Sequence, residues 1–344
     1  MTSILAYPLI FVLSCLGVWI IRHYAEKRQL LDHPNERSSH STPTPRGGGL
    51  MIVLLVTGAG LWSVYEAGFD MLNLSNLYRG LIFVLCGLVI AWLGWRDDIH
   101  SLSPRLRFGV QSMVALISIL SFGYFKSVTI PLFGELQLGV VGFVITFLWI
   151  VGMINAYNFM DGIDGMAGGV AFAGGIGWMF LSGNMQNHFA FWIALAVSAS
   201  SLGFLFHNWS PAKIFMGDVA STFLGYSFAV LPLLSADEGG DALMLGTLLM
   251  WTFIMDAGVT FIQRLIRREN ILSAHRSHLY QRLVTGGYPH STVSFMFIIL
   301  TFVAVRLTHA WAQGSAVAPI LILLGLPAIW VVLSIHADRI NHAE

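Results

Sequence analysis

A polar stretch in an otherwise apolar chain reads NAYNFMDGIDGMAGG, at 155–169. Its hydrogen-bonding side chains recur every third residue, at Asn155, Asn158, Asp161 and Asp164. In a helix this spacing places them in a drifting stripe along one face. Carboxylate and amide oxygens suit a hard divalent cation, and glycines such as Gly162 let a ligand approach closely. Asn and Gly also pack helices together, but two aspartates exceed what packing requires.

A second polar stretch, WRDDIHSLSPRLR at 95–107, carries the adjacent pair Asp97 and Asp98 at the end of an apolar run. Carboxylates at a membrane boundary are costly and usually functional. This pair could bind a divalent cation, take a proton from a phosphate, or simply cap a helix at the interface. The neighbouring Arg105 and Arg107 favour a functional role.

A third stretch, HNWSPAKIFMGDVAST at 207–222, places Lys213 and Asp218 on either side of an aromatic residue, Phe215. Asp218 stands where the next apolar helix is expected to begin. It could therefore cap that helix or offer its carboxylate to a hard cation.

Two further stretches are rich in basic residues. HPNERSSHSTPTPRGGG, at 33–49, contains Arg37, His40 and Arg46 beside a glycine triplet, and it is either an anion-binding loop or a flexible connection. RREN…SAHRSHLYQR, at 267–282, offers basic side chains suited to phosphate, at Arg267, Arg268, His275, Arg276, His278 and Arg282. An H-x-x-H spacing without Cys or Glu is weak for zinc, and a solvated loop is the alternative.

The elements that must position these residues are transmembrane helices. The chain has 344 residues, of which 56% are hydrophobic and 10% charged, and its net charge of zero gives no reason to expect nucleic acid as a partner. We expect an all-α polytopic membrane protein with about eleven spans. They lie near 4–23, 48–66, 79–95, 105–123, 138–155, 168–183, 188–206, 215–234, 242–263, 292–311 and 316–336.

Residues 127–137 are too short to span and predict a small interfacial β-hairpin. With eleven spans, all of the 18 Lys and Arg residues except Arg79, Lys126 and Arg306 fall on one side. By the positive-inside rule that side is cytoplasmic, with the N-terminus outside and the C-terminus inside. A single domain, 1–344, then has its cytoplasmic loops near 24–47, 96–105, 156–167, 207–214 and 264–291, and all five polar stretches share that side.

Carboxylates, asparagines and basic residues at one interface suit Mg²⁺ holding a diphosphate, with arginine and histidine neutralising the remaining charge. The chain has no G-x-x-x-x-G-K-[ST], which disfavours an ATP-driven pump of the P-loop type. It also has no G-x-S-x-G motif, in which serine is the nucleophile. Asp256 is the one acidic residue near the middle of a predicted span, which disfavours an ion-coupled transporter.

The runs RDD (96–98), NAYNFMDGIDGMAGG (155–169) and FMGDVAST (215–222) resemble those of polyprenyl-phosphate N-acetylhexosamine-1-phosphate transferases. The 33–49 stretch resembles the first cytoplasmic loop of the branch that initiates O-antigen. This resemblance covers most of the chain and implies an enzyme of the bacterial inner membrane, with its active site facing the cytoplasm. It would convert a UDP-activated N-acetylamino sugar and undecaprenyl phosphate into undecaprenyl-diphosphate sugar and UMP.

The resemblance also implies roles for individual residues. Mg²⁺, or Mn²⁺ in its place, would be bound by Asp218 with Asn158, while Asp97 and Asp98 would receive the lipid phosphate. Asp161, Gly162 and Asp164 would line the nucleotide pocket, and Phe215 would stack on uracil. His278 would approach the phosphates or the sugar, and the remaining substrate-binding candidates are Arg46, Asn155, Lys213, His275 and Arg276. Where relatives often have further histidines, this chain has Tyr280 and Gln281.

The sequence leaves several alternatives open. A membrane carrier for a nucleotide sugar or lipid-linked sugar would also need a polar cytoplasmic mouth. Direct attack by the lipid phosphate would need a base at most, because a phosphate monoester with a pKa of ~6 is largely ionised at neutral pH. It is preferred over a covalent aspartyl intermediate, because the metal and the arginines already neutralise the charge repulsion that forms the barrier. The donor sugar, the pathway, the separate roles of His275 and His278, and whether the chain forms a homodimer are not decided.

Overall fold

The computed structural model describes residues 2–32, 42–66, 74–184, 187–235, 241–269 and 275–342. The chain is mostly helical, as predicted. Its helices are α1 (Thr2–Arg28), α2 (Leu50–Glu66), α3 (Leu74–Ile99), α4 (Pro104–Phe122), α5 (Val141–Phe159), α6 (Met166–Asn184), α7 (His188–Asn208), α8 (Asp218–Leu234), α9 (Ala242–Leu249), α10 (Trp251–Ile266), α11 (Leu279–Thr285), α12 (His290–Ala312), α13 (Ala318–Ile320), the π-helical η3 (Leu321–Gly325) and α14 (Leu326–His342).

Two small antiparallel sheets interrupt the helices. β3 (Ser127–Ile130) pairs with β4 (Gly134–Gln137), which confirms the predicted hairpin. Leu132 and Gly134, with φ of 70° and 85°, turn the chain between these strands. β1 (Leu31–Asp32) pairs with β2 (Thr44–Pro45) in the first long loop. The sequence did not predict this second sheet, because two-residue strands leave no period to detect.

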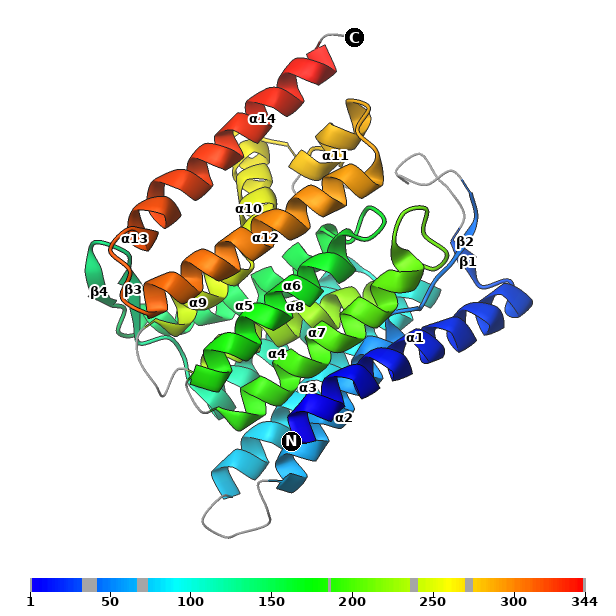
Figure 1. Cartoon of the computed structure of the whole chain (residues 1–344), viewed down its shortest axis with the longest axis horizontal. Helices are drawn as coiled ribbons and strands as arrows, with labels where there is room; N and C mark the ends of the chain where they lie inside the picture. Colours follow the sequence, from blue (N-terminus) through cyan, green and yellow to red (C-terminus); the bar gives the residue numbers. More distant parts are fainter. Residues whose placement is uncertain are drawn as a thin grey trace.

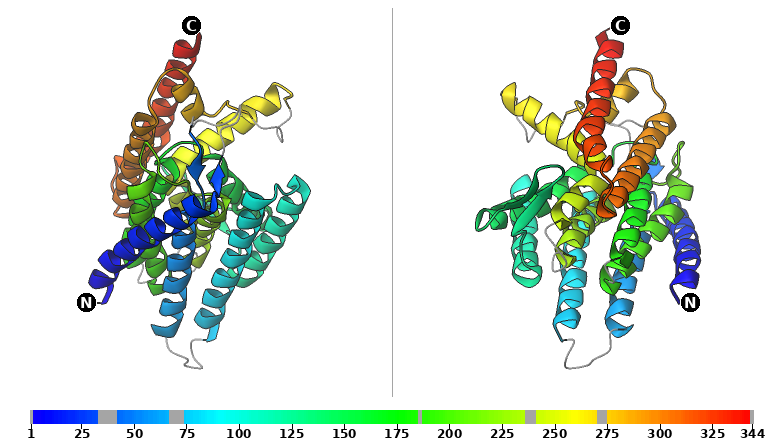
Figure 2. Two further views of the ribbon diagram at one scale, coloured as in Figure 1. Left: turned by 90° about the vertical axis from the view of Figure 1, so that its right-hand side faces the viewer. Right: turned by 60° about the vertical axis from the view of Figure 1, so that its left-hand side comes forward.

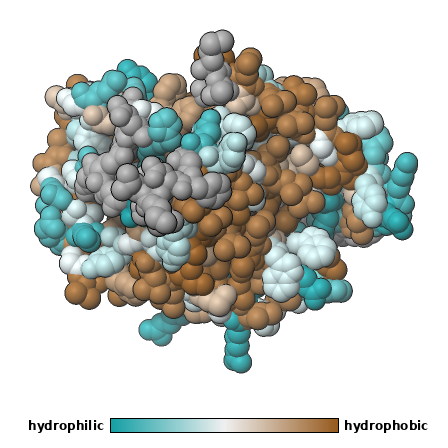
Figure 3. Space-filling view, turned by 90° about the horizontal axis from the view of Figure 1, so that it is seen from below, coloured by the Kyte–Doolittle hydropathy of each residue, from teal (hydrophilic) through white to brown (hydrophobic). Residues whose placement is uncertain are grey.

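Within the described residues, eight helices are long and apolar enough to cross a bilayer, and α9 with α10 forms a further, broken candidate. Two more apolar helices, α2 and α8, are each 17 residues long. Each predicted apolar stretch therefore coincides with a helix or with the broken pair. Figure 3 shows a broad apolar surface with polar residues gathered toward its edges, as a lipid-facing wall requires.

The predicted ninth span, 242–263, differs from the structure. The helix breaks at Met250, and α9 and α10 meet at 85°. Neither proline nor glycine marks this break in the sequence, so hydropathy alone gave one continuous span. Figure 2 shows α10 projecting from the bundle. The apolar side chains of Phe261, Leu265 and Ile266 on this helix are exposed.

The core surrounds α8. Every residue from Val219 to Leu234 is buried, which explains why this helix is apolar on all sides. It packs mainly on α3 and α5, while α7 packs on α1, α2 and α6, and α12 covers α6 (Figure 1). The N-terminus of α8 is thereby held at one end of the bundle, surrounded by the loops of its neighbours.

The two ends of the bundle differ. The β1–β2 sheet and α11 lie toward one end, and the β3–β4 hairpin lies toward the other (Figure 1). Hydrogen bonds and ion pairs join the described residues of all five polar stretches at the first end. The described residues of these stretches, 42–49 of the first among them, thus lie at one end of the bundle, and their position on one side of a membrane stays a prediction. Residues 33–41, with the predicted anion-binding Arg37 and His40, lie outside the described residues.

Candidate active site

The site is built on the first turn of α8. Its N-cap, Gly217, has φ 81° and no side chain to accept the free backbone amides. Asp98 of α3 supplies the cap instead, since its carboxylate oxygens accept from the amides of Asp218 and Val219 at 3.1 and 3.2 Å. A helix start binds negative charge well, so this contact is both a cap and an electrostatic anchor. Gly94 makes the approach possible, because a Cβ there would lie 2.2 Å from the Asp218 carbonyl oxygen.

Asp97 points toward the α3–α4 turn. One of its oxygens accepts from the Leu102 amide and the other from Arg107 Nη1, both at 2.7 Å. Ser103 caps α4, and Pro104 opens it, so the sequence S-P-R-L fixes where Arg107 emerges. Arg107 thus forms an ion pair with Asp97, and Asp97 and Asp98 face different partners.

The glycine triplet of the first loop has a structural cause. The Gly48 and Gly49 amides donate to the carbonyls of Phe215 and Met216 at 2.9 and 3.1 Å, and the Phe215 amide donates to Pro45 at 2.8 Å. A Cβ at Gly49 would lie 2.2 Å from the Cβ of Ala220. The glycines thus let the start of α2 lie directly on the start of α8.

Arg46 joins this loop to the acidic pair. Its guanidinium donates to the backbone carbonyl of Asp98 at 3.1 Å and lies 3.8 Å from that residue's carboxylate. It also forms an ion pair with Asp32. The predicted substrate-binding arginine therefore sits beside the site, with its charge partly engaged by two carboxylates.

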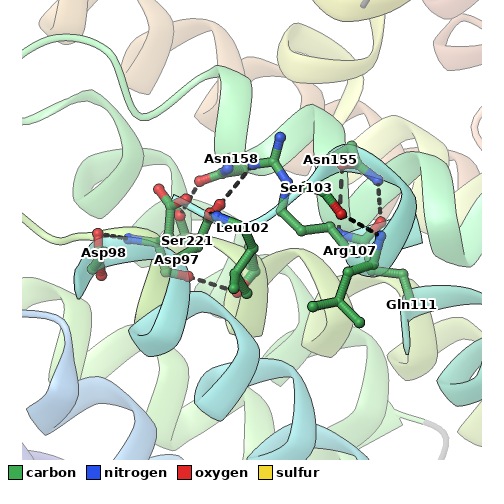
Figure 4. A network of polar contacts seen from close by, with 12 residues as sticks. Asp97, Asp98, Leu102, Ser103, Arg107, Gln111, Asn155, Asn158 and Ser221 are labelled. Carbon is green, nitrogen blue, oxygen red and sulfur yellow. Dashed lines mark hydrogen bonds and ion pairs between the residues drawn. The ribbon is translucent and has the colours of Figure 1, made fainter. Parts of the chain in front are cut away.

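Asn158 and Asn155 of α5 have different surroundings (Figure 4). Asn158 Oδ1 accepts from the hydroxyl of Ser221 in α8 at 2.5 Å. Asn155 donates to Gln111 of α4 at 2.7 Å and to the Val151 carbonyl at 2.8 Å. Asn158 thus lies against α8 near Asp218, whereas Asn155 joins α5 to α4 one turn deeper.

Asp161 is one of several carboxylates that lie close together. Burial, followed by the nearby negative charges of Asp218, Asp98 and Asp164, raises the pKa of Asp161 well above its usual range. Asp218 in turn interacts with Asp98 and Asp97. These aspartates come from three separate stretches of the sequence and meet within electrostatic range of one another.

Asp164 connects three segments. Its side chain accepts from the Ala212 amide at 3.1 Å and pairs with His290 at 3.5 Å, and its carbonyl accepts from Ser294. Burial alone would raise the pKa of this carboxyl, but the hydrogen bonds from His290, Ala212 and Ser210 lower it overall. The predicted nucleotide-binding aspartate is thus held by protein groups from α12 and from the loop before α8.

The last polar stretch reaches the site through His278. This residue is 4% exposed, and its Nδ1 donates to Asp256 of α10 at 3.1 Å. The same carboxylate accepts from the amides of Leu279 and Tyr280 at 2.8 and 3.2 Å. Asp256, the acidic residue near the middle of a predicted span, is therefore the hydrogen-bond partner of His278, a predicted catalytic residue.

Tyr280, which stands where relatives often have histidine, has a packing role. Its hydroxyl donates to the Phe159 carbonyl at 3.0 Å, and a Cβ at Gly162 would lie 2.0 Å from that hydroxyl. Its ring stacks on His278, with centroids 5.8 Å apart. The α5–α6 turn thus packs against α11 through Gly162 and Tyr280.

The other candidates lie around this core. His275 stacks near His278 with centroids 4.9 Å apart, and burial, with the charges of His278 and Arg264, lowers the pKa of His275 to about 4. Lys213 and Arg276 are exposed, and Phe215 is half-buried. These residues line the approach to the site, where a soluble substrate would first make contact.

The oxygen ligands of the site suit a cation that is also bound by water or phosphate oxygens. Among the described residues, no three or more His, Cys, Asp or Glu side chains form a ready-made metal cluster. The raised pKa of Asp161 nevertheless shows crowded negative charge, which a divalent cation would relieve. Mg²⁺ keeps several water or phosphate ligands and needs only one or two from protein. Asp218 and Asn158 can provide these.

A separate cavity of about 730 Å³ lies at the other end of the bundle, beside the β3–β4 hairpin. Its lining includes Arg79, Tyr124 and Lys126, and none of the predicted site residues. The chemistry-bearing side chains therefore gather away from this cavity.

Sequence reasoning missed several residues that hold the site together. Asn208 accepts from the Gly165 amide and donates to the Ile214 carbonyl, both at 2.9 Å. Gln111 and His290 likewise pair with predicted residues. Asn208 and Gln111 are buried polar residues on helices, which was a usable signal, but their partners lie 6 to 44 positions away.

Comparison with known proteins agrees with this geometry. The model of Glycosyl transferase family 4 matches residues 80–236. The chain is 32% identical over 302 residues to the Bacillus subtilis (strain 168) protein "Probable undecaprenyl-phosphate N-acetylglucosaminyl 1-phosphate transferase", covering 85% of this chain and 81% of that protein. The chain belongs to the polyprenyl-phosphate N-acetylhexosamine-1-phosphate transferase family.

More distant members of the family agree. The undecaprenyl-phosphate alpha-N-acetylglucosaminyl 1-phosphate transferase of Escherichia coli (strain K12) is 27% identical over 314 residues, covering 87% of this chain and 80% of that protein. The decaprenyl-phosphate N-acetylglucosaminephosphotransferase of Mycobacterium leprae (strain TN) is 26% identical over 322 residues, covering 84% and 78%. Both similarities extend over most of the chain, so they include the loops that build the site.

Proposed function

We propose that this protein transfers an N-acetylated amino-sugar 1-phosphate from a UDP-sugar to undecaprenyl phosphate, releasing UMP. The observation that carries the proposal is the convergence of Asp97, Asp98, Asp161 and Asp218 at the start of α8, within a member of this family. The names of the relatives favour N-acetylglucosamine as the donor sugar. We further propose that the reaction begins the synthesis of O-antigen or another envelope polysaccharide.

The proposed topology has eleven spans, with α9 and α10 together counted as one. Eight long helices, the broken pair and the two shorter helices α2 and α8 support this number. The predominance of basic residues at the site end supports a cytoplasmic orientation, with the N-terminus outside. The protein would then lie in the bacterial inner membrane, where its active site meets a soluble nucleotide sugar and a lipid phosphate at one interface.

The proposed mechanism assigns a task to each group. Asp218 and Asn158 would hold Mg²⁺, which would supply positive charge to neutralise the donor diphosphate. Arg46 and Arg107 stand beside the acidic pair and attract the lipid phosphate. Asp97 and Asp98 position its oxygen, and little proton removal is needed because the monoester is largely ionised. The phosphate oxygen then attacks the sugar-linked phosphorus, the bond to the UMP oxygen breaks, and UMP leaves.

The remaining candidates form the proposed donor pocket. Asp161 and Gly162 lie in the α5–α6 turn, Phe215 and Lys213 precede α8, and the His275–His278 segment closes the opposite side. Phe215 would stack on uracil, and His278 would meet the sugar or its phosphate. Asn155 and Asp164 are bound mainly to protein groups, and we assign them to holding the pocket's shape.

The test is UMP release from UDP-N-acetylglucosamine by the purified protein in detergent, with undecaprenyl phosphate and Mg²⁺. We expect turnover in the wild type and a loss of at least about 1,000-fold in Asp218→Asn, because a metal ligand is removed. Asp338→Asn, at a carboxylate 59% exposed, is the matched control and should retain activity.

Full activity in Asp218→Asn would overturn the assignment of the metal site. A wild-type protein that releases no UMP but exchanges radiolabelled nucleotide sugar across a vesicle membrane would be the alternative, a carrier. Chelation by EDTA and restoration with Mg²⁺ or Mn²⁺ tests the cofactor separately. Inversion at phosphorus is expected for direct attack, and retention would instead indicate a covalent aspartyl intermediate.

A further inference from the structure

A buried carboxylate lies behind the histidine of the active site. Asp256 is fully buried on α10, yet it is 3.1 Å from His278 Nδ1. Besides this ring, it accepts from the Leu279 and Tyr280 amides and from Thr260 Oγ1 at 3.3 Å. A buried carboxylate is costly unless it is fully bonded, and each oxygen of this one is engaged.

This contact fixes the hydrogen on one ring nitrogen. A carboxylate accepts and cannot donate, so the facing Nδ1 must carry a hydrogen in the neutral ring. The lone pair of the neutral ring is then on Nε2. If the ring takes up a proton, Nε2 becomes a donor, and Asp256 faces the resulting charge.

The ring cannot rotate away from this arrangement. His278 lies between three other rings, with centroid distances of 4.9 Å to His275, 5.8 Å to Tyr280 and 6.3 Å to Phe159. Within the described residues its hydrogen bonds run through Nδ1, and Nε2 is not among the buried polar atoms left without a partner. Phe159 is the last residue of α5, so the His278 ring lies beside the α5–α6 turn.

We propose that Asp256 is a positioning residue that holds His278 as the Nδ1–H form and directs Nε2 toward the bound donor. The partner of Nε2 would be a group that accepts or offers one hydrogen bond, either a hydroxyl of the sugar or an oxygen of the diphosphate. This proposal rests on the proposed function for its substrate. It explains why an aspartate is retained in a helix that is otherwise apolar at this depth.

The first test is a double-mutant cycle on UMP release. His278→Asn keeps a donor near the Nδ1 position and removes Nε2. Asp256→Asn should lower kcat/KM by about 10–100-fold, the range seen when the partner that orients a ligating histidine is removed. In the His278→Asn background, the same change should cost less than about 2-fold, because the two residues act as one unit. Equal losses in both backgrounds would show that Asp256 only caps α11.

A matched control separates ring orientation from helix capping. Gln281 Oε1 accepts from the His278 amide at 3.3 Å without touching the imidazole–carboxylate contact. Gln281→Ala should therefore loosen the start of α11 and keep kcat/KM within about 2-fold of wild type, since only a modest hydrogen bond is lost. A loss equal to that of Asp256→Asn would overturn the proposal.

The second readout does not depend on activity. ¹⁵N-histidine spectra at pH 8 should contain a signal with hydrogen on Nδ1 that disappears in His278→Asn and shifts toward the Nε2–H form in Asp256→Asn. An unchanged signal in Asp256→Asn would contradict the proposal. If the wild-type protein released no UMP, the proposed function would fail while the spectra still decided whether Asp256 sets the tautomer.

Discussion

Two helix starts in this protein are capped in the same way and placed in opposite electrostatic surroundings. Asp98 of α3 accepts two amides at the start of α8, and Asp256 of α10 accepts two amides at the start of α11. Each aspartate is remote in sequence from the helix it caps. Neither cap could be read from the residues just before the helix, where capping is normally sought.

The surroundings give these two caps different functions. Asp98 lies among the carboxylates of Asp97, Asp161 and Asp218, with Arg46 nearby, so its region attracts cations. Asp256 is fully buried, and its other contacts are to His278 and Thr260. One buried aspartate thus supports the edge of a proposed metal and phosphate site, while the other holds a single ring in place.

The largest effect is expected from a substitution that disrupts the cap of α8. Gly94→Ala would place a Cβ 2.2 Å from the Asp218 carbonyl oxygen, which is backbone and cannot move aside. We expect α3 to be displaced from α8, at a cost of about 3 kcal/mol in stability, and Asp98 to lose both amides. Thermal unfolding in detergent and UMP release measure this.

The matched control is Gly109→Ala on α4, where nothing lies within 4 Å of the added methyl. This helical substitution should be neutral or slightly stabilising, because alanine restricts the unfolded chain more than glycine does. If Gly94→Ala behaved like Gly109→Ala, the close approach of α3 to α8 would not be what positions Asp98.

A smaller effect separates the two aspartates. In Asp256→Asn the new side-chain NH2 group faces a buried N–H donor, and both are left without an acceptor. We therefore expect the free energy of unfolding to fall by about 1–3 kcal/mol. Asp98→Asn also loses an acceptor but relieves repulsion from Asp97, Asp161 and Asp218, so its unfolding temperature should fall less. Its activity should fall more, because it lies next to the reacting phosphates. The reverse order of the two unfolding temperatures would contradict this contrast.

The smallest effect concerns the contact between the two regions. Gly162→Ala would clash with the Tyr280 hydroxyl at 2.0 Å, and we expect it to cost about 1–2 kcal/mol and to displace Asp161. Tyr280→Phe removes that oxygen, so the double variant should recover part of the loss in unfolding temperature and UMP release. Recovery would be incomplete because the ring carbon behind the oxygen is 2.8 Å away. No recovery at all would show that Tyr280 is not the obstacle.

The sequence by itself determined the class of the protein and the polar stretches that the structure brings together. Apolar stretches of about 20 residues predict membrane helices whatever the tertiary packing, because the bilayer thickness sets their length. The offsets of Asn155, Asn158, Asp161 and Asp164 and the runs RDD and FMGD identified the polar stretches that the structure brings together. The short hairpin at 127–137 was also recognisable, since alternation and a Phe-Gly turn are local signals.

Only the tertiary structure decided what each polar residue does within the site. It broke the predicted ninth span at Met250, made Asp98 and Asp256 caps for helices elsewhere in the chain, and gave Asp164 its partners on α12. The reason is physical: a carboxylate can accept from any amide that packing brings within about 3 Å, and sequence distance does not enter. Local pattern specifies which groups must find partners, and the packing of the bundle specifies which partners they find.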